Sequence, residues 1–450
     1  MQKIKTSLKF RPNDTFGNIM VQHFQRRNSP LKCVHQYPTT EKHRERFLKH
    51  GWNNVYVKTI QDIWNRFVDT NERVKLESVD EPFDEASELM LKCLHYVLII
   101  GVKNMELGLD DFWTSTMPFD TVPCQMNLKV QTPTNFELNR TFQRYGHISW
   151  TLGNRVFIAG GLLPSQKRPM SVTCLNQELN SIIWTKDLLK MNNSVFSACD
   201  VLKDFCYIFG GRGSPFNPSD AFMKIDCDGN TTEVMETKTT DRPESRWGHT
   251  FTTYENDLFL IGGRNQNLVY DHVYEFSTDK KKWSLVKKLD FGIYSHSTVC
   301  WKGFLIINGG LKDFSKCQVN RDLILIQPAP FGSSLRQVPN LPNHYFGRFA
   351  HTSHITDCGK LLQVGGVVIG AKLDIVLTVI DINDIGNVIV TNYEANTTLK
   401  APLVQHTSLL YFDEKKVKKD EEKIVVFGGG TNCFSFGMHV NSDLIKIDYS

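Results

Sequence analysis

From about residue 140 onward, short apolar runs that end in two glycines recur along the chain. Two examples are LFLI before Gly262 and Gly263, and IVVF before Gly428 and Gly429. A continuous apolar run of this length, bounded by a turn signal, is typical of a strand buried on both faces. Shortly before each run another strand pattern begins, usually at a motif that contains histidine. The pattern predicts a repeated pair of strands, in which the glycines allow a turn that a Cβ atom would obstruct.

Six copies of this pair follow one another, and their first glycines are 47 to 63 residues apart. A period of roughly 50 residues with four strands in each unit is the kelch repeat, which builds one blade of a β-propeller. We therefore predict that residues 124–450 form an all-β, six-bladed kelch β-propeller. The second copy lacks the arginine and the histidine of the motif but keeps its glycine pair. The structural glycines are Gly160, Gly161, Gly210, Gly211, Gly262, Gly263, Gly309, Gly310, Gly365, Gly366, Gly428 and Gly429.

The two ends of the repeated region are predicted to complete one blade together. The last copy is followed by a single strand pattern, NSDLIKIDYS, so its blade lacks an outermost strand. The segment CQMNLKVQTP, which precedes the first copy, is the expected donor of that strand. Its insertion closes the ring and leaves no free sheet edge. Trp184 and Trp283 occupy positions where a kelch unit packs a tryptophan between blades.

One histidine begins the strand nearest the central channel in five of the six copies. A ring of histidines suggests a metal site, but one residue per blade spaces the side chains too widely to share an ion. We expect structural hydrogen bonds from these side chains, and we predict no metal site. The five residues are His147, His249, His296, His351 and His406.

Basic side chains gather at one end of the predicted propeller. The turn before the first strand and the turn after the second strand share one end of a four-stranded meander, so their side chains form one rim. Cations arranged in this way suit phosphates, and the alternative is an ordinary solvated loop surface. The candidate RNA-contact residues of this rim are Arg144, Arg212, Arg246, Arg264, Lys312 and Arg348.

Residues 1–113 follow the spacing of helices rather than that of the repeat. In DTFGNIMVQHFQRR the apolar positions fall on one helical face behind Asp14 or Thr15 as N-cap. TTEKHRERFLKHGW has the same character, and EPFDEASELMLKCLHYVLIIG predicts an acidic amphipathic helix that leads into a short buried strand. The sequence thus predicts an α/β segment, joined to the propeller by a linker at residues 114–123.

Composition and charge limit the possible functions. A net charge of +4 and a pI of about 8.4 fit mild attraction to a polyanion, whereas a dedicated nucleic-acid binder is usually far more basic. RNA therefore stays possible, and we predict no DNA binding. The 11 cysteines form no C-x-x-C pair, and the longest apolar run, YVLIIGV, is too short to cross a bilayer. We expect reduced thiols, a cytoplasmic location and no membrane anchoring.

Two stretches of the N-terminal segment resemble a known family. They are DTFGNIMVQHFQRRNSPLKCVHQYPTTEKHRERFLKHGWNNVYVKTIQDIW and ERVKLESVDEPFDEASELMLKCLHY. Over about residues 13–112 the chain is similar to the C-terminal part of leucine carboxyl methyltransferase-like domains, and it looks closest to the wybutosine-synthesizing branch, in which a kelch propeller follows. The resemblance implies a Rossmann-like class I methyltransferase that uses S-adenosylmethionine. It also implies methylation, then methoxycarbonylation, of the wybutosine precursor side chain in phenylalanine tRNA.

One part of the family's pattern is not found in the sequence. In a doubly wound fold the cofactor lies beside a Gly-rich turn that follows an early strand, whereas Gly17, Gly51, Gly101 and Gly108 are scattered. Residues 1–113 therefore match an N-terminally truncated remnant of the domain, without its cofactor-binding half. We expect the cofactor-binding and catalytic residues to lie upstream of Met1 and assign none to this chain. We predict no S-adenosylmethionine binding and no methyl transfer by this chain alone.

Two other functions remain open at this point. The chain could be a non-enzymatic kelch scaffold or adaptor, with protein partners on the propeller and a vestigial methyltransferase segment. A weaker alternative is the related protein phosphatase leucine carboxyl methyltransferase, against which the attached propeller argues. The acidic cluster in ESVDEPFDE offers paired carboxylates, but its position at the start of a helix favours helix capping over acid–base chemistry.

Overall fold

The computed structural model describes most of the chain in two compact units. Unit 1 contains Met1–Val122, Ile369–Asp374 and Asn432–Gly437, and unit 2 contains Pro123–Val368, Ile375–Thr431 and Met438–Ser450. The acidic cluster in ESVDEPFDE and nearly all of the predicted linker lie outside the described residues. The described residues are 2–68, 72, 86–103, 113, 123–187, 195–214, 216–237, 240–312, 318–328, 334–338, 347–368, 375–383, 388–397, 399–411, 423–433 and 436–449.

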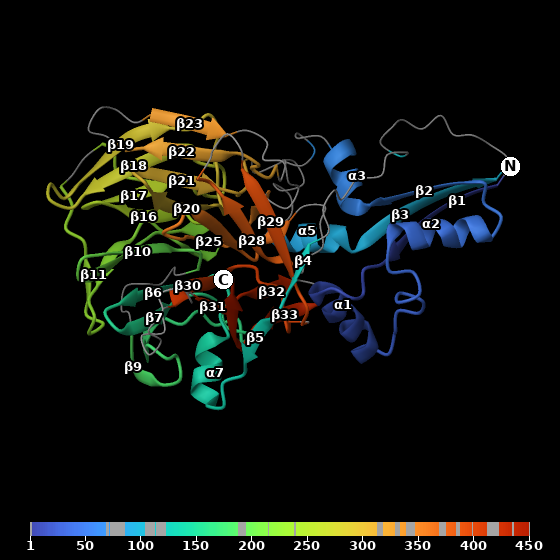
Figure 1. The fold of residues 1–450 in the computed structure, drawn as a ribbon, viewed down its shortest axis with the longest axis horizontal. Helices are drawn as coiled ribbons and strands as arrows, with labels where there is room; N and C mark the ends of the chain where they lie inside the picture. The colour runs from blue at the N-terminus through green and yellow to red at the C-terminus, as the bar shows by residue number, and fades with distance from the viewer. Residues whose placement is uncertain are drawn as a thin grey trace. The chain divides into compact units, whose positions relative to one another are not determined.

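Unit 1 contains a three-stranded sheet in the order β1–β3–β2 (Figure 1). The central strand β3 (Tyr96–Lys103) is antiparallel to both β1 (Gln2–Lys9) and β2 (Asn54–Thr59). β1 and β2 therefore run in the same direction and are joined through helices, as in a β-α-β crossover, with β3 inserted between them. The sequence predicted β3 but gave no local sign of β1, because pairing along a distant strand leaves no mark on the short segment itself.

The helices of unit 1 are α1 (Thr15–Arg26), α2 (Thr40–Lys49), α3 (Ile60–Phe67) and α5 (Ala86–Leu94). Asp14 is the N-cap of α1 and accepts a hydrogen bond from the Gly17 N–H at 2.7 Å. Thr39 caps α2 in the same way. α5 leads directly into β3, which confirms the predicted helix and buried strand. The apolar faces of α1 and α5 pack on each other in a cluster that contains Phe16, Ile19, Met20, Leu91, Leu94 and Phe436.

Unit 2 contains six antiparallel sheets of four main strands each among the described residues. The first three are β6 (Ile148–Leu152), β7 (Arg155–Ala159), β8 (Ser171–Asn176) and β9 (Ile182–Asp187); β10 (Ala198–Leu202), β11 (Phe205–Phe209), β14 (Phe222–Ile225) and β15 (Thr231–Glu233); and β16 (Thr250–Tyr254), β17 (Asp257–Ile261), β18 (His272–Ser277) and β19 (Lys282–Lys288).

Two of the other three sheets also use a strand from the start of unit 2. They are β20 (Ser297–Trp301), β21 (Phe304–Asn308), β22 (Leu323–Gln327) and β23 (Ser334–Val338); β25 (Thr352–Ile355), β26 (Lys360–Val364), β28 (Ile375–Asp381) and β29 (Ile389–Ala395), extended by β4 (Cys124–Met126); and β30 (His406–Tyr411), β31 (Lys423–Gly428), β34 (Leu444–Asp448) and β5 (Leu128–Gln131). Smaller elements are α7 (Phe136–Phe142) and the pairs β12 (Arg212–Ser214) with β13 (Asn217–Pro218), β24 (Arg348–Phe349) with β27 (Val367–Val368), and β32 (Gly430–Cys433) with β33 (Gly437–Val440).

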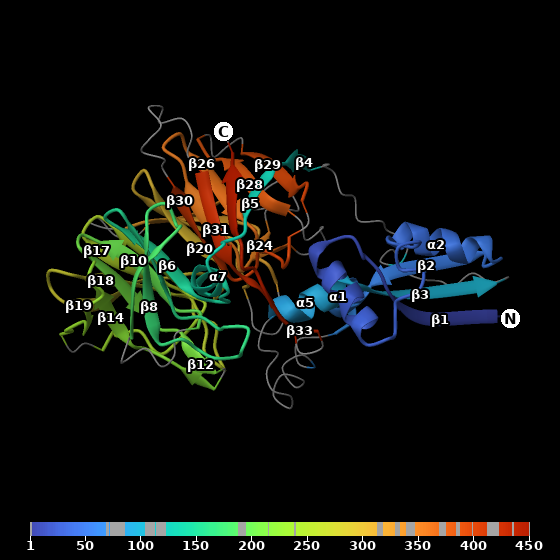
Figure 2. The same ribbon diagram turned by 90° about the horizontal axis from the view of Figure 1, so that it is seen from below.

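The inner strands of the six sheets follow one another in a closed circle. β6, β10, β16, β20, β25 and β30 each contact the next, and β30 contacts β6 again. The segment CQMNLKVQTP contributes as predicted, because its strand β5 pairs antiparallel with β34. It also supplies β4, which pairs in parallel with β29 in the neighbouring sheet and was not predicted. Figure 2 shows β4 and β5 beside strands from the far end of the sequence.

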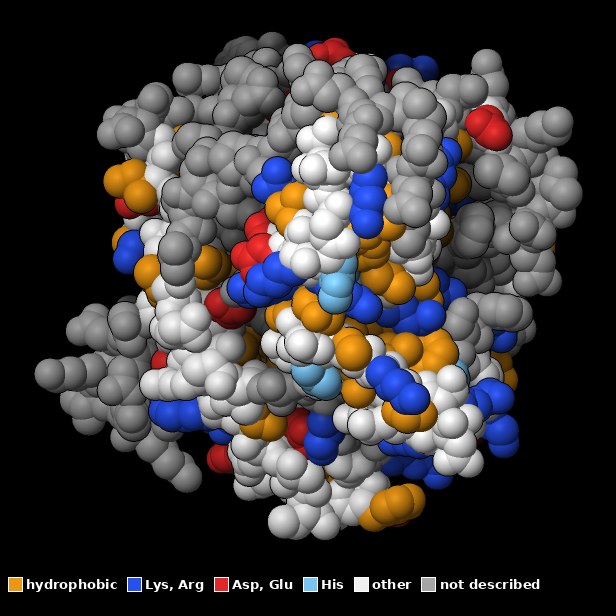
Figure 3. Space-filling view, turned by 90° about the vertical axis from the view of Figure 1, so that its right-hand side faces the viewer, with side chains coloured by type: hydrophobic (Ala, Val, Ile, Leu, Met, Phe, Trp, Pro, Cys, Tyr) orange, Lys and Arg blue, Asp and Glu red, His pale blue; other side chains and the backbone are white. Residues whose placement is uncertain are grey.

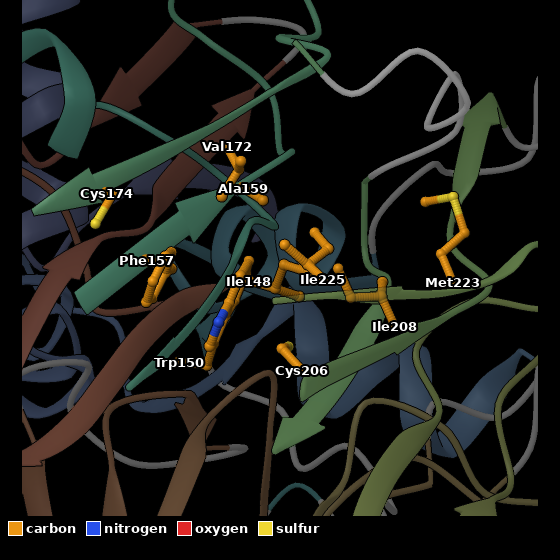
Figure 4. Packing of buried hydrophobic residues seen from close by; sticks show 10 residues of the cluster. All are labelled: Ile148, Trp150, Phe157, Ala159, Val172, Cys174, Cys206, Ile208, Met223 and Ile225. Carbon is orange, nitrogen blue, oxygen red and sulfur yellow. The ribbon is translucent and has the colours of Figure 1, made fainter. Parts of the chain in front are cut away.

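The core of unit 2 lies between neighbouring sheets. Figure 4 shows one such layer, in which Trp150 and Phe157 of the first sheet stack at 5.3 Å and share a cluster with Cys206 and Ile208 of the second. Trp283 fills the next layer and is fully buried among phenylalanines of the second and third sheets. Trp184 is only partly buried at the first layer. Both tryptophans therefore pack between sheets, as the sequence predicted.

Replacement of Trp283 tests this packing. We expect Trp283→Ala to lower the free energy of unfolding of unit 2 by about 3–5 kcal/mol, because a fully buried indole leaves a large cavity. Trp184→Ala is the matched control and is expected to cost less, since part of that side chain is already in water. Urea unfolding followed by circular dichroism measures both. Equal losses of unfolding free energy in the two variants would contradict the expectation that the more deeply buried tryptophan contributes more to stability.

Candidate functional site

Six residues at the start of the inner strands form a closed ring of backbone hydrogen bonds, here called the backbone ring. The N–H of each residue donates to the carbonyl oxygen of its counterpart in the preceding sheet, at N···O distances of 2.7–3.3 Å. The circle closes because the first residue donates to the sixth. All six have φ between +52° and +65°, where residues other than glycine are uncommon. They are Gly146, Phe196, Gly248, Ser295, Ala350 and Gln405.

The backbone ring explains why the weakest copy of the repeat still fits. Phe196 belongs to the copy that lacks the arginine and the histidine of the motif, yet its backbone takes the same positive φ and makes the same hydrogen bonds. The ring therefore depends on backbone conformation rather than on those side chains. The sequence signal that could have identified it is the position before each inner strand, not its residue type.

The five predicted histidines line a cavity of about 100 Å³ at the backbone ring. Four of them bond to a side chain of the preceding sheet: His147 to Thr407 at 2.8 Å, His296 to Thr250 at 3.0 Å, His351 to Asn308 at 2.9 Å and His406 to Thr352 at 3.1 Å. These contacts confirm a structural hydrogen-bonding role for four of the five, whereas both ring nitrogens of His249 are buried without a hydrogen-bond partner. No group of three or more metal-ligating side chains occurs among the described residues.

Burial keeps these histidines neutral. It lowers the pKa of His249, His296 and His406 to about 3 and holds the pKa of His147 and His351 well below the usual value. A neutral imidazole fits the contacts described above, because its Nε2 atom exchanges a single hydrogen bond with a neutral hydroxyl or amide. The ring of histidines is therefore part of the packing of the inner strands and not a cationic surface.

The stability of unit 2 is expected to fall in mild acid. The histidines have a pKa near 6.5 in the unfolded chain but a lower pKa when folded, so the unfolded state binds more protons below about pH 6.5. Stability present above that pH is lost as the pH falls towards the folded pKa. We expect a lower melting temperature at pH 5 than at pH 7. In His296→Asn/His406→Asn the difference between the two pH values becomes smaller; an unchanged difference would contradict this origin.

The three arginines of the repeat motif do not lie on an exposed rim. Arg144 is 4% exposed, and Arg246 and Arg348 are fully buried. Their Nη1 atoms donate to the carbonyl oxygens of Gly160, Gly262 and Gly365, the first glycine of each pair, at 3.0, 3.0 and 2.8 Å. The predicted RNA contact is therefore wrong for these three, because each guanidinium closes its own repeat by satisfying a buried carbonyl group.

Burial also changes the acidity of these arginines. It lowers the pKa of Arg144 to about 10 and that of Arg348 to about 9, and it lowers the pKa of Arg246 as well. Arg246 lies with its guanidinium carbon 3.9 Å from the ring centre of Tyr270. The loss of hydration is thus partly offset by carbonyl groups and an aromatic face.

The other predicted rim residues also make intramolecular contacts. Arg212 is 5% exposed and its guanidinium lies over the rings of Phe196 and Trp247 at 4.8 and 5.0 Å. Arg264 lies over Trp247 and Tyr294 at 5.3 and 5.1 Å. The resulting ladder of aromatic and cationic side chains joins three neighbouring sheets. Since Arg212 is buried, its predicted RNA contact is wrong too.

Lys312 is paired with a carboxylate. Its Nζ atom lies 2.9 Å from Oδ2 of Asp322, and it also lies over the Phe291 ring. An RNA phosphate would have to compete with that carboxylate. RNA contact by Arg264 and Lys312 stays a prediction.

Arg348 offers a direct test of the structural role. We expect Arg348→Met to lower the free energy of unfolding by about 1.5–3 kcal/mol, because a charged hydrogen bond to the Gly365 carbonyl is lost. Any RNA affinity of the folded variant is expected to keep its dependence on salt concentration. Exposed Lys360→Met serves as the control for loss of one positive charge. If the salt dependence of RNA binding were reduced in Arg348→Met but not in Lys360→Met, Arg348 would be identified as an RNA contact instead.

Unit 1 contains one buried carboxylate–imidazole pair that the sequence did not reveal. His95 Nε2 lies 2.8 Å from Asp14 Oδ1, and its Nδ1 lies 2.7 Å from the carbonyl oxygen of Leu91. The two side chains are 0% and 8% exposed. Because Asp14 also caps α1, the pair ties the start of α1 to the end of α5. Its enclosure makes it a structural contact rather than a catalytic one.

Known proteins match this chain over both units. A family model for the KLHDC2/KLHL20/DRC7 kelch-repeats domain matches residues 146–366. tRNA wybutosine-synthesizing protein 4 of Rattus norvegicus is 28% identical over 473 aligned residues, which cover 98% of this chain and 67% of that protein. The proteins of the same name from Homo sapiens and Candida glabrata are 28% and 24% identical, cover 98% and 97% of this chain, and are themselves covered over 67% and 63% of their length.

These alignments cover nearly all of this chain but only part of each relative. The chain spans about two thirds of the length of these relatives. No helix among the described residues is long and apolar enough to cross a membrane. Because the alignment runs through both units and not only through the repeats, the chain is similar over nearly its whole length to tRNA wybutosine-synthesizing protein 4, and a kelch-repeat model matches part of unit 2.

Proposed function

We propose that this protein acts in the synthesis of wybutosine in phenylalanine tRNA. The observation that carries the proposal is the similarity over 98% of the chain to proteins named for that process. Kelch repeats alone would carry little, since one fold serves many functions. The match continues through unit 1, which has no kelch repeat. A cytoplasmic location remains part of this proposal.

The reaction we propose is methylation followed by methoxycarbonylation of the precursor side chain, with S-adenosylmethionine as the methyl donor. The described residues of unit 1 do not fit that cofactor. Gly17 lies in the first turn of α1, Gly51 follows α2, and Gly101 lies inside β3. None of these three glycines follows a strand in a turn that approaches a pyrophosphate or nucleoside. We therefore assign no step of the reaction to a residue of this chain.

The architecture we propose is a six-bladed propeller preceded by part of a methyltransferase domain. The six four-stranded sheets and the closed backbone ring support the propeller. The β-α-β crossover of β1 and β2, with helices between them, supports an α/β origin for unit 1. A non-enzymatic kelch scaffold is the second candidate function, because a kelch-repeat model matches residues 146–366 and that fold serves many functions.

Mass spectrometry of phenylalanine tRNA from cells that lack the gene tests the proposed function. We expect mature wybutosine to be absent and a precursor without the methyl ester and methoxycarbonyl groups to accumulate. Other modified nucleosides of the same tRNA serve as the internal control and stay at their normal level. Normal wybutosine in these cells would contradict the proposal and favour the scaffold.

A further inference from the structure

Positive charge is concentrated in one part of unit 1, residues 23–50, here called the basic segment. It contains seven Lys and Arg side chains and only two Glu, a net charge of +5, whereas the whole 450-residue chain has +4. The remainder of the protein is therefore nearly neutral. The segment covers the end of α1, the following loop and all of α2. Its basic residues are Arg26, Arg27, Lys32, Lys42, Arg44, Arg46 and Lys49.

The cations of the basic segment face solvent. All are exposed except Arg46, which is half-buried and lies over the Tyr37 ring at 4.6 Å. Lys42 pairs with Glu45, and Glu41 accepts a hydrogen bond from Thr40. Within the described part of the chain, no ion pair involves Arg26, Arg27, Lys32 or Lys49. These side chains differ from the motif arginines of unit 2, Arg144, Arg246 and Arg348, which are buried.

Helix stability explains only some of these positions. Arg26, Arg46 and Lys49 lie in the last turns of α1 and α2, where the helix dipole favours cations. Arg27 is the C-cap of α1 and gains from the same dipole, but Lys32 lies well beyond α1, and Lys42 lies in the first turn of α2, where the dipole disfavours a cation. Lys42, Arg46 and Lys49 repeat at helical spacing, so they form one face about 10 Å long. The distribution is that of a charged surface rather than of capped helix ends.

The surface lacks the features of a protein interface. Leu48, at 38% exposed, is its one strongly exposed large hydrophobic side chain. Protein interfaces use buried aromatic or aliphatic anchors at their centre. Contacts to a nucleic-acid backbone need cations and little apolar area. Figure 3 shows a face of the molecule on which, among the coloured side chains, Lys and Arg are more plentiful than Asp and Glu.

We propose that the basic segment of unit 1 binds the phosphate backbone of RNA. The proposal rests on the proposed function, which supplies an RNA substrate, and it adds the surface that holds that substrate. Contacts to phosphates carry no base sequence, so the segment contributes affinity and orientation while recognition of the modified base lies elsewhere. Arg26, Arg27, Lys32 and Lys49 supply most of the effect because they are exposed and form no ion pair with any described residue.

The test compares two triple variants of the full chain. Arg26→Gln/Arg27→Gln/Lys49→Gln removes three charges from the basic segment, and Lys280→Gln/Lys282→Gln/Lys360→Gln removes three exposed charges from unit 2. Fluorescence anisotropy measures binding of an unmodified phenylalanine tRNA transcript between 50 and 200 mM KCl. We expect the segment variant to bind at least about tenfold more weakly, with a salt slope reduced by about two to three. The control is expected to bind like the wild type.

A second variant protects the test against loss of structure. Arg27→Gln/Lys32→Gln changes two positions outside the helices, and we expect about two thirds of the reduction in salt slope with an unchanged circular dichroism spectrum. An unrelated RNA hairpin is expected to lose affinity in parallel with the tRNA, since the contacts are to phosphates.

Several results would overturn the proposal. They are unchanged affinity of the segment variants, equal losses in the segment variant and the control, no RNA binding by the wild type, or tighter binding of poly-glutamate than of RNA at equal charge concentration. The last result would identify an acidic protein as the partner. None of them alters the nucleoside analysis of the deletion strain, so failure of this inference is distinguishable from failure of the proposed function.

Discussion

The backbone ring is the constraint on which unit 2 depends. Six sheets whose inner strands form a closed circle bring buried N–H and C=O groups together, and each of these groups needs a partner. The ring gives every inner strand one donor and one acceptor from its two neighbours. The cost is a positive φ at six positions, only two of which are glycine. Each of the other four costs on the order of 1–3 kcal/mol, which the hydrogen bonds and the apolar layers offset.

The backbone ring also determines which contacts the recurring residues of the repeat can make. In four of the six repeats the side chain that follows the ring residue is a histidine that bonds to a hydroxyl or amide group of the neighbouring sheet. The arginine two positions before the ring reaches back to its own glycine pair. That pair cannot be altered easily: a Cβ atom at Gly262 would collide with the Ile293 carbonyl of the next repeat. The arginines, histidines and glycines of the motif thus serve mainly to hold each repeat together and to join it to its neighbours.

The sequence was informative where the signal is local and poor where it is not. Apolar runs before glycine pairs predicted the strands, and the unpaired last strand predicted the use of β5 to complete the sixth sheet. β1 pairs with β3, and β4 pairs with β29, although the paired segments are far apart in the sequence. The short strands themselves carry no sequence pattern that indicates these pairings. The candidate rim failed for a different reason. An arginine beside a glycine turn has the same sequence pattern whether it faces water or a buried carbonyl group, and only the burial of Arg246 and Arg348 tells the two apart.

This distinction bears on how charge is used in the protein. A guanidinium that already donates to Gly262, or a lysine already paired with Asp322, has little left to offer a phosphate. Salt dependence in binding a polyanion arises from counterions released by cations that gain a new partner. The salt dependence of binding therefore depends on how many cations lack a partner within the protein. That number is not given by the total of Lys and Arg residues. In this chain the repeats hold most of the motif arginines internally, while the loop and helix of unit 1 leave Arg27, Lys32 and Lys49 in water. The motif arginines therefore add little to any electrostatic attraction for RNA, whereas the exposed cations of the basic segment remain available for it.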